Sequence, residues 1–455
     1  MNRIELPLDY QSDPAIYFEH LLGEPWPIWL DSGHTKGSRY DILVARPYKT
    51  LVTRGAITTI SDRNGTSTSH QAPLKILSEQ LRIDGLTENR QPFSGGAVGY
   101  FGYGLNTKRD AEHKDDSIVP DMAIGLYSCA VIIDHQLKTA HLSGLFDDET
   151  DGRRELKSLQ ALLEQPSSQS RPAPSFGIDG PFSESLNRQQ YRDAFSKIQH
   201  YLQEGDCYQV NLTQRFSAPC HGDLWGLYQA IRKRNPAPYG AFMQLDDVDV
   251  LSFSPEQFLK LSQRQVTTSP IKGTRPRNPD PQLDQLALSE LRNSEKERAE
   301  NLMIVDLLRN DLGRCCRTGS IKVPKLFFTE SHPTVHHLVS TITGELAANK
   351  TAIDLLHDCF PGGSITGAPK IRAMEIIDEV EPVKRHIYCG SIGYIGFDGS
   401  METNIAIRTA YHHNGEISFH AGGGIITDSN VESEYQELFD KAGFFLNYFQ
   451  NPIEE

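Results

Sequence analysis

The chain has 455 residues, enough for two or three domains or for one large composite. Its formal net charge of -14 at pH 7 argues against nucleic acid and anionic membranes as main partners. With 38% hydrophobic and 23% charged residues it has the composition of a soluble globular protein with a real core. A small anionic substrate is compatible with this charge, because local cations or a metal set the field at a site.

Cysteine usage and the N-terminus predict the compartment. The seven cysteines include no Cys-x-x-Cys pair, which predicts reduced thiols and neither a disulfide framework nor a zinc site built on them. The first residues have no apolar signal core, and no apolar run approaches the roughly 18 residues that span a bilayer. We therefore expect a soluble cytoplasmic protein that binds no membrane.

The N-terminal part has the pattern of short strands. Residues 40–45 and 130–134 are rich in β-formers and are bounded by turn residues. Two glycine-rich runs, 96–103 and 390–397, resemble each other and predict strands that another backbone or a ligand approaches closely. Their likeness leaves two interpretations open, a coincidence or a duplicated pair of sheets.

A Pro- and Ser-rich stretch at 165–175 predicts a linker. Beyond it, strands alternate with helices predicted at 189–205 and, buried on most faces, at 286–310. This order favours an α+β fold over a doubly wound sheet. Nucleotide binding has no support, because neither a Walker loop nor a dinucleotide fingerprint is present. We expect a β-rich domain at 1–160, a linker at 161–185 and a catalytic domain at 186–450.

Lys272 stands next to Gly273 and Thr274 in a predicted turn. An amine beside such a turn is a candidate nucleophile if its pKa is depressed. The neighbouring Arg275 and Arg277 are expected to lower the pKa of Lys272. Most lysines are simply solvated, so this residue alone does not decide the function.

Two Glu-x-x-Glu pairs lie far from Lys272 in sequence, and the two members of each pair share one face of a predicted helix. Ser294 and Ser429 precede them as helix caps, each in a Ser-x-x-Glu box, so part of each signal is structural. Apolar neighbours indicate that the carboxylates point inward, where they need a metal, a cation or a proton. The pairs are Glu297 with Glu300 and Glu434 with Glu437.

A glycine-rich loop at 361–370 leads into a predicted helix and could present backbone N–H groups to an anion. The run 422–424 is a second place where a backbone approaches closely. Arg408 lies in a strand-like apolar run, either exposed or gripping a carboxylate. His337 is equally well explained as a hydrogen-bonded core histidine.

Taken together, these segments resemble the chorismate-utilising enzymes, which include anthranilate, aminodeoxychorismate, isochorismate and salicylate synthases. The resemblance covers nearly the whole chain and is densest from about 190 to 445. It implies an α+β composite of two packed antiparallel sheets with flanking helices, as in anthranilate synthase component I. The matching segments are residues 206–212, 304–312, 337–340, 361–370 and 421–425.

Lys272 also distinguishes members of this family. Anthranilate synthases carry Ala within the Pro-Ile-x-Gly-Thr motif, whereas aminodeoxychorismate synthase component I carries Lys. Isochorismate and salicylate synthases have a base Lys where this chain has Gln209, so direct attack by water is disfavoured. The resemblance therefore implies amination of chorismate through a covalent Lys272 adduct. It also implies ammonia from a separate glutamine amidotransferase subunit, because no Gly-x-Cys-x-Gly nucleophile loop occurs here.

The resemblance also implies roles for individual residues. Glu256 protonates the departing C4 hydroxyl, and the four paired glutamates hold Mg²⁺. The residues implied to bind or orient the substrate are Gly273, Thr274, His337, Thr366, Tyr388, Arg408, Gly422, Gly424 and Lys441.

A second, smaller site is implied in the N-terminal part, because several residues resemble the tryptophan pocket of the family. Asp31 stands where the feedback-regulated enzymes usually have Glu, so we expect at most a structurally held tryptophan. The pocket residues are Ser32, Tyr40, Asn211, Pro238 and Tyr239.

Two alternatives remain at the level of the sequence. An anthranilate synthase component I would release pyruvate and an aromatic product, and Lys272 argues against it. A non-catalytic regulator that binds chorismate or tryptophan would need neither an acid nor a nucleophile, and Glu256 and Lys272 argue against that class.

Overall fold

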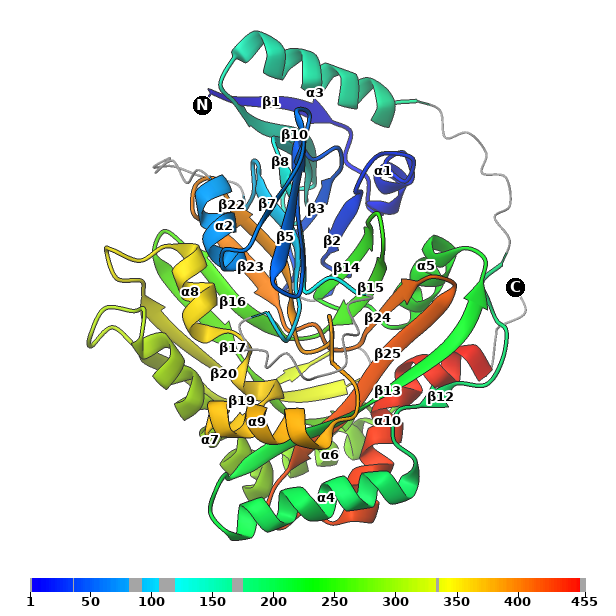
Figure 1. Cartoon of the computed structure of the whole chain (residues 1–455), viewed down its shortest axis with the longest axis vertical. Coiled ribbons are helices and arrows are strands. Elements are labelled where there is room, and N and C mark those ends of the chain that lie inside the picture. The colour runs from blue at the N-terminus through cyan, green and yellow to red at the C-terminus, as the bar shows by residue number, and fades with distance from the viewer. Residues whose placement is uncertain are drawn as a thin grey trace. The chain divides into compact units, whose positions relative to one another are not determined.

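The computed structural model describes residues 2–35, 37–81, 92–105, 119–165, 175–332 and 335–450. Their strands form two large antiparallel sheets, of 13 and 12 strands, with flanking helices (Figure 1). This confirms the α+β composite expected from the sequence. Among the described residues, none of the helices is long and apolar enough to cross a membrane.

The chain divides into two compact units, each assembled from three separate stretches. Unit 1 comprises Met1–Gly180, Pro219–Pro255 and His386–Ile417, and unit 2 comprises Pro181–Ala218, Glu256–Arg385 and Ser418–Glu455. The sequence-level division at 161–185 stays a prediction, and most of the predicted linker, residues 166–174, lies outside the described residues.

Unit 1 holds two strand runs that pack on a common core. The first run has the order β1-β10-β9-β3-β2-β14-β15-β24 and the second β22-β7-β8-β4-β5-β6, with β23 beside β22. Because period-2 alternation puts alternate side chains on one face, Ile28, Ile42 and Ile132 of the first run meet Val98 and Ile392 of the second in one cluster. The strands are β1 Asn2–Leu8, β2 Ile28–Asp31, β3 Tyr40–Val44, β4 Lys49–Arg54, β5 Ile57–Asp62, β6 Gly65–Ser69, β7 Gly96–Phe101, β8 Met122–Tyr127, β9 Cys129–Asp134, β10 Thr139–Phe146, β14 Tyr239–Gln244, β15 Asp249–Ser254, β22 Ser391–Gly396, β23 Met401–Asn404 and β24 Thr409–His413.

The two glycine-rich runs are neighbours in one sheet. β7 and β22 pair antiparallel from Gly96 opposite Gly396 to Phe101 opposite Ser391. A Cβ on Gly393 would lie 2.1 Å from the carbonyl oxygen of Glu402, so only glycine fits there. The expected close backbone approach is therefore confirmed, and both interpretations of the likeness, coincidence and duplication, stay open.

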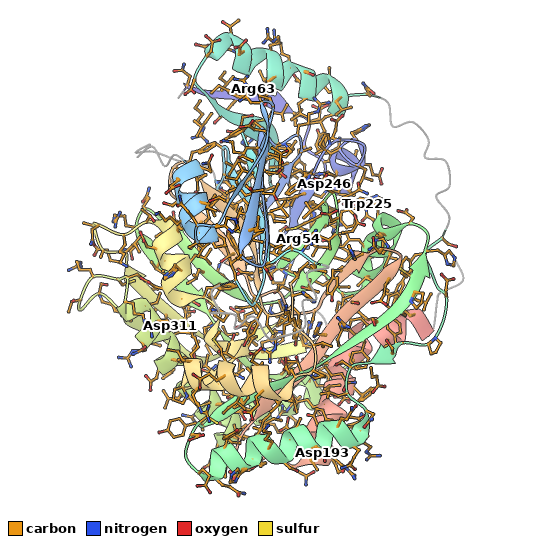
Figure 2. The ribbon with its side chains drawn as sticks, in the orientation of Figure 1. Arg54, Arg63, Asp193, Trp225, Asp246 and Asp311 are labelled. Atoms are coloured by element: carbon orange, nitrogen blue, oxygen red, sulfur yellow. The ribbon has the colours of Figure 1, made fainter. Side chains whose placement is uncertain are left out.

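Helices of unit 1 cover the sheet surfaces. α3 packs along β1 and β10 (Figure 1). Its N-cap is Asp148, whose carboxylate accepts from the N–H of Asp151. Trp225, labelled in Figure 2, lies on α5. Its ring stacks on that of Tyr228, with 6.0 Å between ring centroids. The helices are α1 Ala15–Glu19, α2 Pro73–Gln80, α3 Glu149–Leu163 and α5 Leu224–Arg234, and a short strand β11 Gly177–Ile178 pairs with Cys220 and His221.

Unit 2 carries the long C-terminal strands and most of the longer helices. β13 lies beside β25, β12 and β21, and β18-β20-β17-β16 form a second run with β19 beside β20. The strands are β12 Ser183–Glu184, β13 Gln209–His221, β16 Gln257–Ser262, β17 Gln265–Ser269, β18 Ile271–Pro276, β19 Lys322–Ser331, β20 Val335–Glu345, β21 Gly367–Ala368 and β25 Glu416–Ile425. The helices are α4 Arg188–Gln203, α6 Pro281–Asn293, α7 Glu295–Gly313, α8 Ala352–Cys359, the 3₁₀ turn Gly363–Ile365, α9 Lys370–Val380 and α10 Val431–Gln450.

Capping explains where these helices begin and corrects two expectations. The predicted single helix at 286–310 is two helices, because Ser294 ends α6 and its side chain caps α7 by accepting from the N–H of Glu297. The predicted box at Ser429 is wrong, since Asn430 caps α10 by accepting from the N–H groups of Glu432 and Ser433. α7 is also not buried all round, because Leu302 is exposed.

Candidate active site

Lys272 lies on β18 where the strand is irregular. The pairing of β18 with β20 shifts register between Ile271 and Thr274, so Lys272 and Gly273 form a bulge. Gly273 has a φ of +84°, and a Cβ there would lie 2.8 Å from Oε2 of Glu297. A glycine is therefore required next to the amine, and it brings the strand against a glutamate of α7.

The amine of Lys272 is half-buried and has no close partner. No hydrogen bond, and no ion pair within 4.0 Å, reaches it from a described residue. Burial lowers its pKa and the charge of Lys441 lowers it further, while Glu300 and Glu256 oppose the shift. The expected direction of the pKa shift is confirmed but its expected cause is wrong. Arg275 pairs with Glu297 at 3.3 Å and Arg277 with Asp284 at 2.9 Å.

Glu256 is a buried carboxyl that accepts a hydrogen bond from Ser364. It lies between β15 and β16, directly before Gln257, and Ser364 Oγ donates to its Oε1 at 2.7 Å. Burial raises the pKa of Glu256 to about 7, although the Ser364 bond, the charge of Lys272 and the Ile271 N–H all lower it. A carboxyl with this pKa is half protonated at neutral pH, as a general acid must be.

The two glutamates of α7 differ in their surroundings. The side chain of Glu297 lies by Arg275 and Gly273. Glu300 is more buried, with 14% of its side chain exposed, and Lys296 lies 3.9 Å away. Burial raises the pKa of Glu300, while the charge of Lys272 lowers it. An inward carboxylate whose nearest cations are distant is suited to a metal or a cationic substrate group.

The glutamates of α10 gather with Lys441 around Gly423 of β25. From a Cβ placed on Gly423, Oε2 of Glu434 is 3.4 Å away, Nζ of Lys441 3.5 Å and Oε1 of Glu437 3.6 Å. Glu434 is buried and accepts from Ser429 Oγ at 2.7 Å. Burial raises the pKa of Glu434. Three charged side chains of one helix therefore face one glycine.

Glu437 departs from the expectation of an inward carboxylate. Its side chain is 52% exposed and pairs with Lys441 at 2.6 Å. Although burial opposes the shift, this pair lowers the pKa of Glu437. Lys441 also donates to the carbonyl oxygen of Gly422 at 3.1 Å. The i,i+4 spacing on α10 places this cation where the glutamates and the glycine strand meet.

The four paired glutamates offer the oxygen ligands that Mg²⁺ prefers. Their pKa shifts couple α7 to α10, because the charge of Glu434 raises the pKa of Glu300. Within the described residues, no three of these carboxylates bring oxygens within 4.8 Å of one another. The oxygen ligands of these residues are therefore suitable for a hard cation. Water molecules or a substrate carboxylate would supply the remaining ligands.

Glycines of β25 allow β13 to come very close. A Cβ on Gly422 would lie 2.2 Å from the Leu212 carbonyl oxygen, and one on Gly424 would lie 2.6 Å from Nε2 of Gln209. Gln209 is fully buried and its Nε2 donates to Oδ1 of Asn211 at 3.1 Å. This bond fixes the orientation of the Gln209 amide.

The glycine-rich loop folds on itself before α9. Thr366 is fully buried, and its hydroxyl donates to the carbonyl oxygens of Gly362 at 3.0 Å and Gly363 at 3.3 Å. Its carbonyl oxygen accepts from the Asn211 N–H at 2.8 Å. His337 is also buried, and its Nδ1 lies 2.9 Å from Oγ1 of Thr274. Thr366 and His337 are thus held by neighbours rather than mobile.

Two buried ion pairs hold this loop from either side. Lys370 Nζ lies 2.5 Å from Asp311 Oδ2 and 2.8 Å from the Cys359 carbonyl oxygen, and Asp311 stands on α7 in Figure 2. Arg385 pairs with Glu381 at 2.7 Å and donates to the carbonyl oxygen of Ile365 at 2.9 Å. Both pairs connect the loop to secondary structure, so its backbone is fixed.

Several expected site residues lie in unit 1. Tyr388 is buried, and Arg408 stands just before β24 with a φ of +48° rather than inside a strand. Burial lowers the pKa of Arg408. Their place in a substrate site stays a prediction.

The residues of the expected tryptophan pocket divide between the units. β14 pairs with β2, which brings Tyr239 next to the turn of Ser32, and a Cβ on Gly33 would lie 2.4 Å from the Ala237 carbonyl oxygen. Tyr40 lies on β3 beside β2. Asn211 belongs to unit 2, where it contacts Gln209 and the loop. The pocket stays a prediction.

Sequence reasoning missed four contributors to this site. Ser364, which donates to Glu256, lies inside the glycine-rich loop for which the sequence predicts anion binding by the backbone. Lys370 and Arg385 were not assigned, although Glu381 and Arg385 stand at the i,i+4 spacing of an ion pair. Asp311 gave no signal, because its partner Lys370 is 59 residues away.

Known proteins resemble this chain along nearly all of its length. The sequence profile described as chorismate binding enzyme matches residues 27–447. Aminodeoxychorismate synthase component 1 of Klebsiella aerogenes is 45% identical over 98% of this chain and 99% of that protein. The protein of the same name from Escherichia coli K12 is 46% identical, covering 98% of each chain.

Solved structures resemble the fold. Anthranilate synthase component I from Streptococcus pneumoniae TIGR4 superposes with a TM-score of 0.78 at 30% identity, covering 90% of this chain and 92% of the other. The menaquinone-specific isochorismate synthase MenF from Escherichia coli has a TM-score of 0.73 at 19% identity, covering 99% and 94%. The second likeness concerns the fold alone.

Proposed function

The chain belongs to the family of chorismate binding enzymes, and we propose that it converts chorismate and ammonia to 4-amino-4-deoxychorismate. The relatives with 45% and 46% identity are named for this synthase activity. The observation that carries the proposal is an amine without a close partner, Lys272, in the same unit as a carboxyl, Glu256, with a pKa near 7. This is the pair that nucleophilic substitution of a hydroxyl requires.

In the proposed first step, the neutral amine of Lys272 attacks C2 of the chorismate ring. The ring electrons shift, and the C4 hydroxyl leaves as water after taking a proton from Glu256. Burial favours both starting protonation states, because it lowers the pKa of the amine and raises that of the acid. The product of this step is a covalent Lys272 adduct.

In the second step, ammonia attacks C4 and the ring electrons return, which breaks the bond between C2 and Lys272. Chorismate and ammonia thus give 4-amino-4-deoxychorismate and water, and the enolpyruvyl group is retained. Gln209 stands at the position where isochorismate synthases carry a base Lys, so no base activates water there. The product is a precursor of p-aminobenzoate and folate.

Mg²⁺ is the proposed cofactor, held by Glu297, Glu300, Glu434 and Glu437, and when bound it would neutralise a substrate carboxylate. Lys441 would add positive charge at the same place, 2.6 Å from Glu437. Arg408, Tyr388 and the backbone of Gly422 and Gly424 are proposed to hold the enolpyruvyl carboxylate. Gly273, Thr274, His337 and Thr366 are proposed to orient the ring.

Ammonia is proposed to come from a separate glutamine amidotransferase subunit. The relatives are called component 1, which implies another component. With the chain alone, ammonium should support turnover and glutamine should not. Addition of the amidotransferase subunit should make glutamine a substrate.

A structurally held tryptophan is proposed in unit 1, close to Ser32, Tyr40, Pro238 and Tyr239. Calorimetry of the purified chain with tryptophan, and mass spectrometry of the denatured protein, would detect it. Absence of tryptophan by both methods would remove this part of the proposal.

Mass spectrometry of the product tests the function directly. The purified chain is incubated with chorismate, Mg²⁺ and ammonium, and an amino product that retains pyruvate is expected. Anthranilate would instead assign the chain to the other amination reaction of the family. No Mg²⁺-dependent turnover of any kind would favour a regulator that only binds chorismate.

A further inference from the structure

The turn after β2 in unit 1 brings two histidines and a buried aspartate together. Each of His34, Asp41 and His135 offers one ligand atom, and these atoms all lie within 4.8 Å of one another. Among the described residues, no other His, Cys, Asp and Glu set is this tight, the paired glutamates of unit 2 included. None of these three residues has a place in the proposed reaction.

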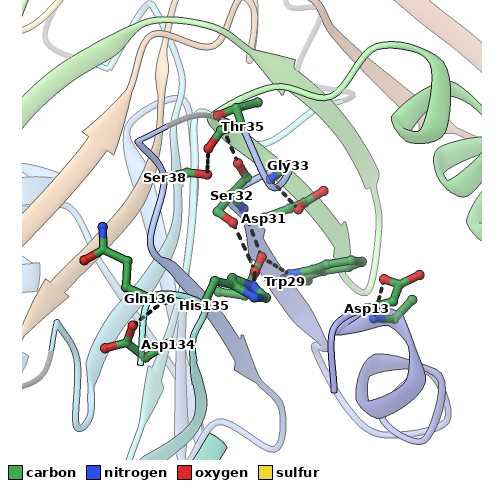
Figure 3. A network of polar contacts seen from close by, with 12 residues as sticks. Asp13, Trp29, Asp31, Ser32, Gly33, Thr35, Ser38, Asp134, His135 and Gln136 are labelled. Atoms are coloured by element: carbon green, nitrogen blue, oxygen red, sulfur yellow. Dashed lines mark hydrogen bonds and ion pairs between the residues drawn. The ribbon is translucent and has the colours of Figure 1, made fainter. Parts of the chain in front are cut away.

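Asp41 is the fixed centre of this cluster. It lies on β3 and is fully buried, and its Oδ1 accepts from Trp29 Nε1 and from the Ser32 N–H, both at 2.9 Å. Its Oδ2 accepts from Ser32 Oγ at 3.1 Å and is in close contact with Nε2 of His135. Figure 3 shows Trp29, Ser32 and His135 converging in this way. The carboxylate is rigid, as a metal ligand should be.

His135 is oriented by a second hydrogen bond. It follows β9 directly, and its Nδ1 lies 3.0 Å from the hydroxyl of Tyr10. A bond at one ring nitrogen is how proteins aim the other nitrogen at a metal. In the metal-free chain Nε2–H donates to Asp41 Oδ2. When Nδ1 carries the proton and donates to the Tyr10 oxygen, the lone pair of Nε2 can bind a metal.

His34 is the part of the cluster that hydrogen bonding does not explain. Its ring centroid lies 3.9 Å from that of His135, and no hydrogen bond from a described residue reaches its imidazole. Its backbone has a φ of +50°, which is unfavourable for a residue with a side chain. Strain of this kind marks positions that surrounding structure or function holds in place. The side chain is exposed, so an ion can reach it from solvent.

The nearby arginine is engaged elsewhere. Asp31 and Arg232 next to the turn form their own ion pair, with 2.6 Å between Nε and Oδ2. Among the described residues, Asp41 has no ion pair with a lysine or an arginine.

We propose that His34, Asp41 and His135 form a Zn²⁺ site that fastens the turn after β2 to β3 and to the end of β9. Two imidazoles and one carboxylate with a water molecule make a four-coordinate set, and imidazole prefers zinc to Mg²⁺. On binding, the proton on Nε2 of His135 is replaced by the metal, and Nδ1–H donates to Tyr10. The proposal does not depend on the reaction proposed for unit 2.

Calorimetry of the untagged, metal-free chain with Zn²⁺, in excess Mg²⁺, tests the proposal. One ion per chain should bind, and Co²⁺ should give the visible absorption of a four-coordinate complex. His34→Ala should abolish the Co²⁺ spectrum, while His70→Ala, which changes another exposed histidine, should leave it unchanged. Tyr10→Phe should weaken binding by roughly 10–100-fold, the usual effect of losing such an orienting bond.

A further variant tests whether the paired glutamates of unit 2 bind the added Zn²⁺ instead. Glu300→Gln should bind Zn²⁺ in unit 1 as the wild-type chain does. Equal binding by the wild-type chain and His34→Ala, or no uptake of Zn²⁺ by the wild-type chain, would overturn the proposal. The exposure of His34 means that its variant should keep the fold, which the melting temperature of the metal-free protein checks.

Discussion

Lys272 and Lys370 lie in the same unit, and their surroundings differ. Lys370 has 13% of its side chain exposed and two close partners, Asp311 at 2.5 Å and the Cys359 carbonyl oxygen at 2.8 Å. Lys272 has no such partner among the described residues, and burial lowers its pKa. The carboxyls repeat the contrast, because Glu381 is paired with Arg385 while Glu256 has a pKa near 7.

These two comparisons distinguish charged groups that stabilise the fold from groups that can react with a substrate. A buried charge with complete partners keeps its ordinary protonation state and fixes the backbone. A buried group with incomplete partners has a shifted pKa and is available to a substrate. Changes at each kind of residue should therefore have different signatures.

The largest effect is expected for Lys272→Ala. Turnover of chorismate with ammonium should fall on the order of 10³-fold or more, because the covalent route is lost. Intact-protein mass spectrometry after acid quench should detect a chorismate-derived adduct in the wild-type chain and none in the variant. Thermal stability should not fall, since the amine has no partner to lose.

Lys370→Ala is the matched control. It leaves Asp311 buried without its cation, which should lower the free energy of unfolding by about 3–5 kcal/mol. Denaturant unfolding measures this loss. The folded fraction of this variant should still form the adduct at Lys272. If that fraction formed no adduct, the proposed difference in role, with Lys370 structural and Lys272 reactive, would be contradicted.

Glu256→Gln should lower turnover by about 10²–10⁴-fold, because the general acid is removed. In the wild-type chain the activity should fall as pH rises through about 7, where this acid loses its proton. The variant should lack that limb of the profile. A wild-type rate in the variant would exclude Glu256 from the acid role.

The same variant should gain stability at high pH. The folded pKa of Glu256 is raised from 4.5 to about 7, so the folded protein binds the proton more tightly than the unfolded chain. Its favourable contribution is complete below the unfolded pKa and is lost as pH rises through about 7. Glutamine removes this loss, so the gain should be small near pH 4 and at most about 3 kcal/mol at pH 8. Melting temperatures at the two pH values measure it.

Arg385→Ala should destabilise the glycine-rich loop 361–370, because the arginine side chain donates to the carbonyl oxygen of Ile365. Loss of the buried cation leaves Glu381 unpaired, with a cost of about 3–5 kcal/mol. Arg385→Lys keeps the charge but not the forked contacts to Ile365 and Asn211, so it should recover most of the stability. If the loop orients substrate, KM should stay raised in the Lys variant while kcat recovers. Equal recovery of both would mean that the residue is structural alone.

The smallest effect is expected for Ser364→Ala. Its hydroxyl donates to the ionised form of Glu256, so its removal should raise the pKa of that carboxyl. The pH at which activity falls on the alkaline side should rise by about one unit. The reason is that a hydrogen bond to a charged group contributes roughly 1.5 kcal/mol, which corresponds to about one pKa unit. Ser364→Thr, which keeps the hydroxyl, is the control. An unchanged limb would show that Ser364 does not tune the acid.

Much of the framework followed from local pattern. The helix predicted at 189–205 is α4, whose buried Tyr191, Phe195, Ile198 and Leu202 repeat at helical spacing. The strands predicted at 40–45 and 130–134 are β3 and β9. Ser294 signalled the start of α7, although the two helices around it were predicted as one. Spacing of three or four residues fixes such features, because it decides which side chains share a face.

Contacts between residues far apart in the chain could not be predicted from spacing. The family motifs, the strand and helix periods and the residue types of the site follow from the sequence alone. Only the fold paired the two glycine-rich strands, placed Ser364 on Glu256 and gave Lys370 a partner 59 residues away. It also placed Glu437 half in solvent beside Lys441, and gathered His34, Asp41 and His135. Such contacts depend on the path of the chain between distant residues, and burial along that path then sets their pKa values.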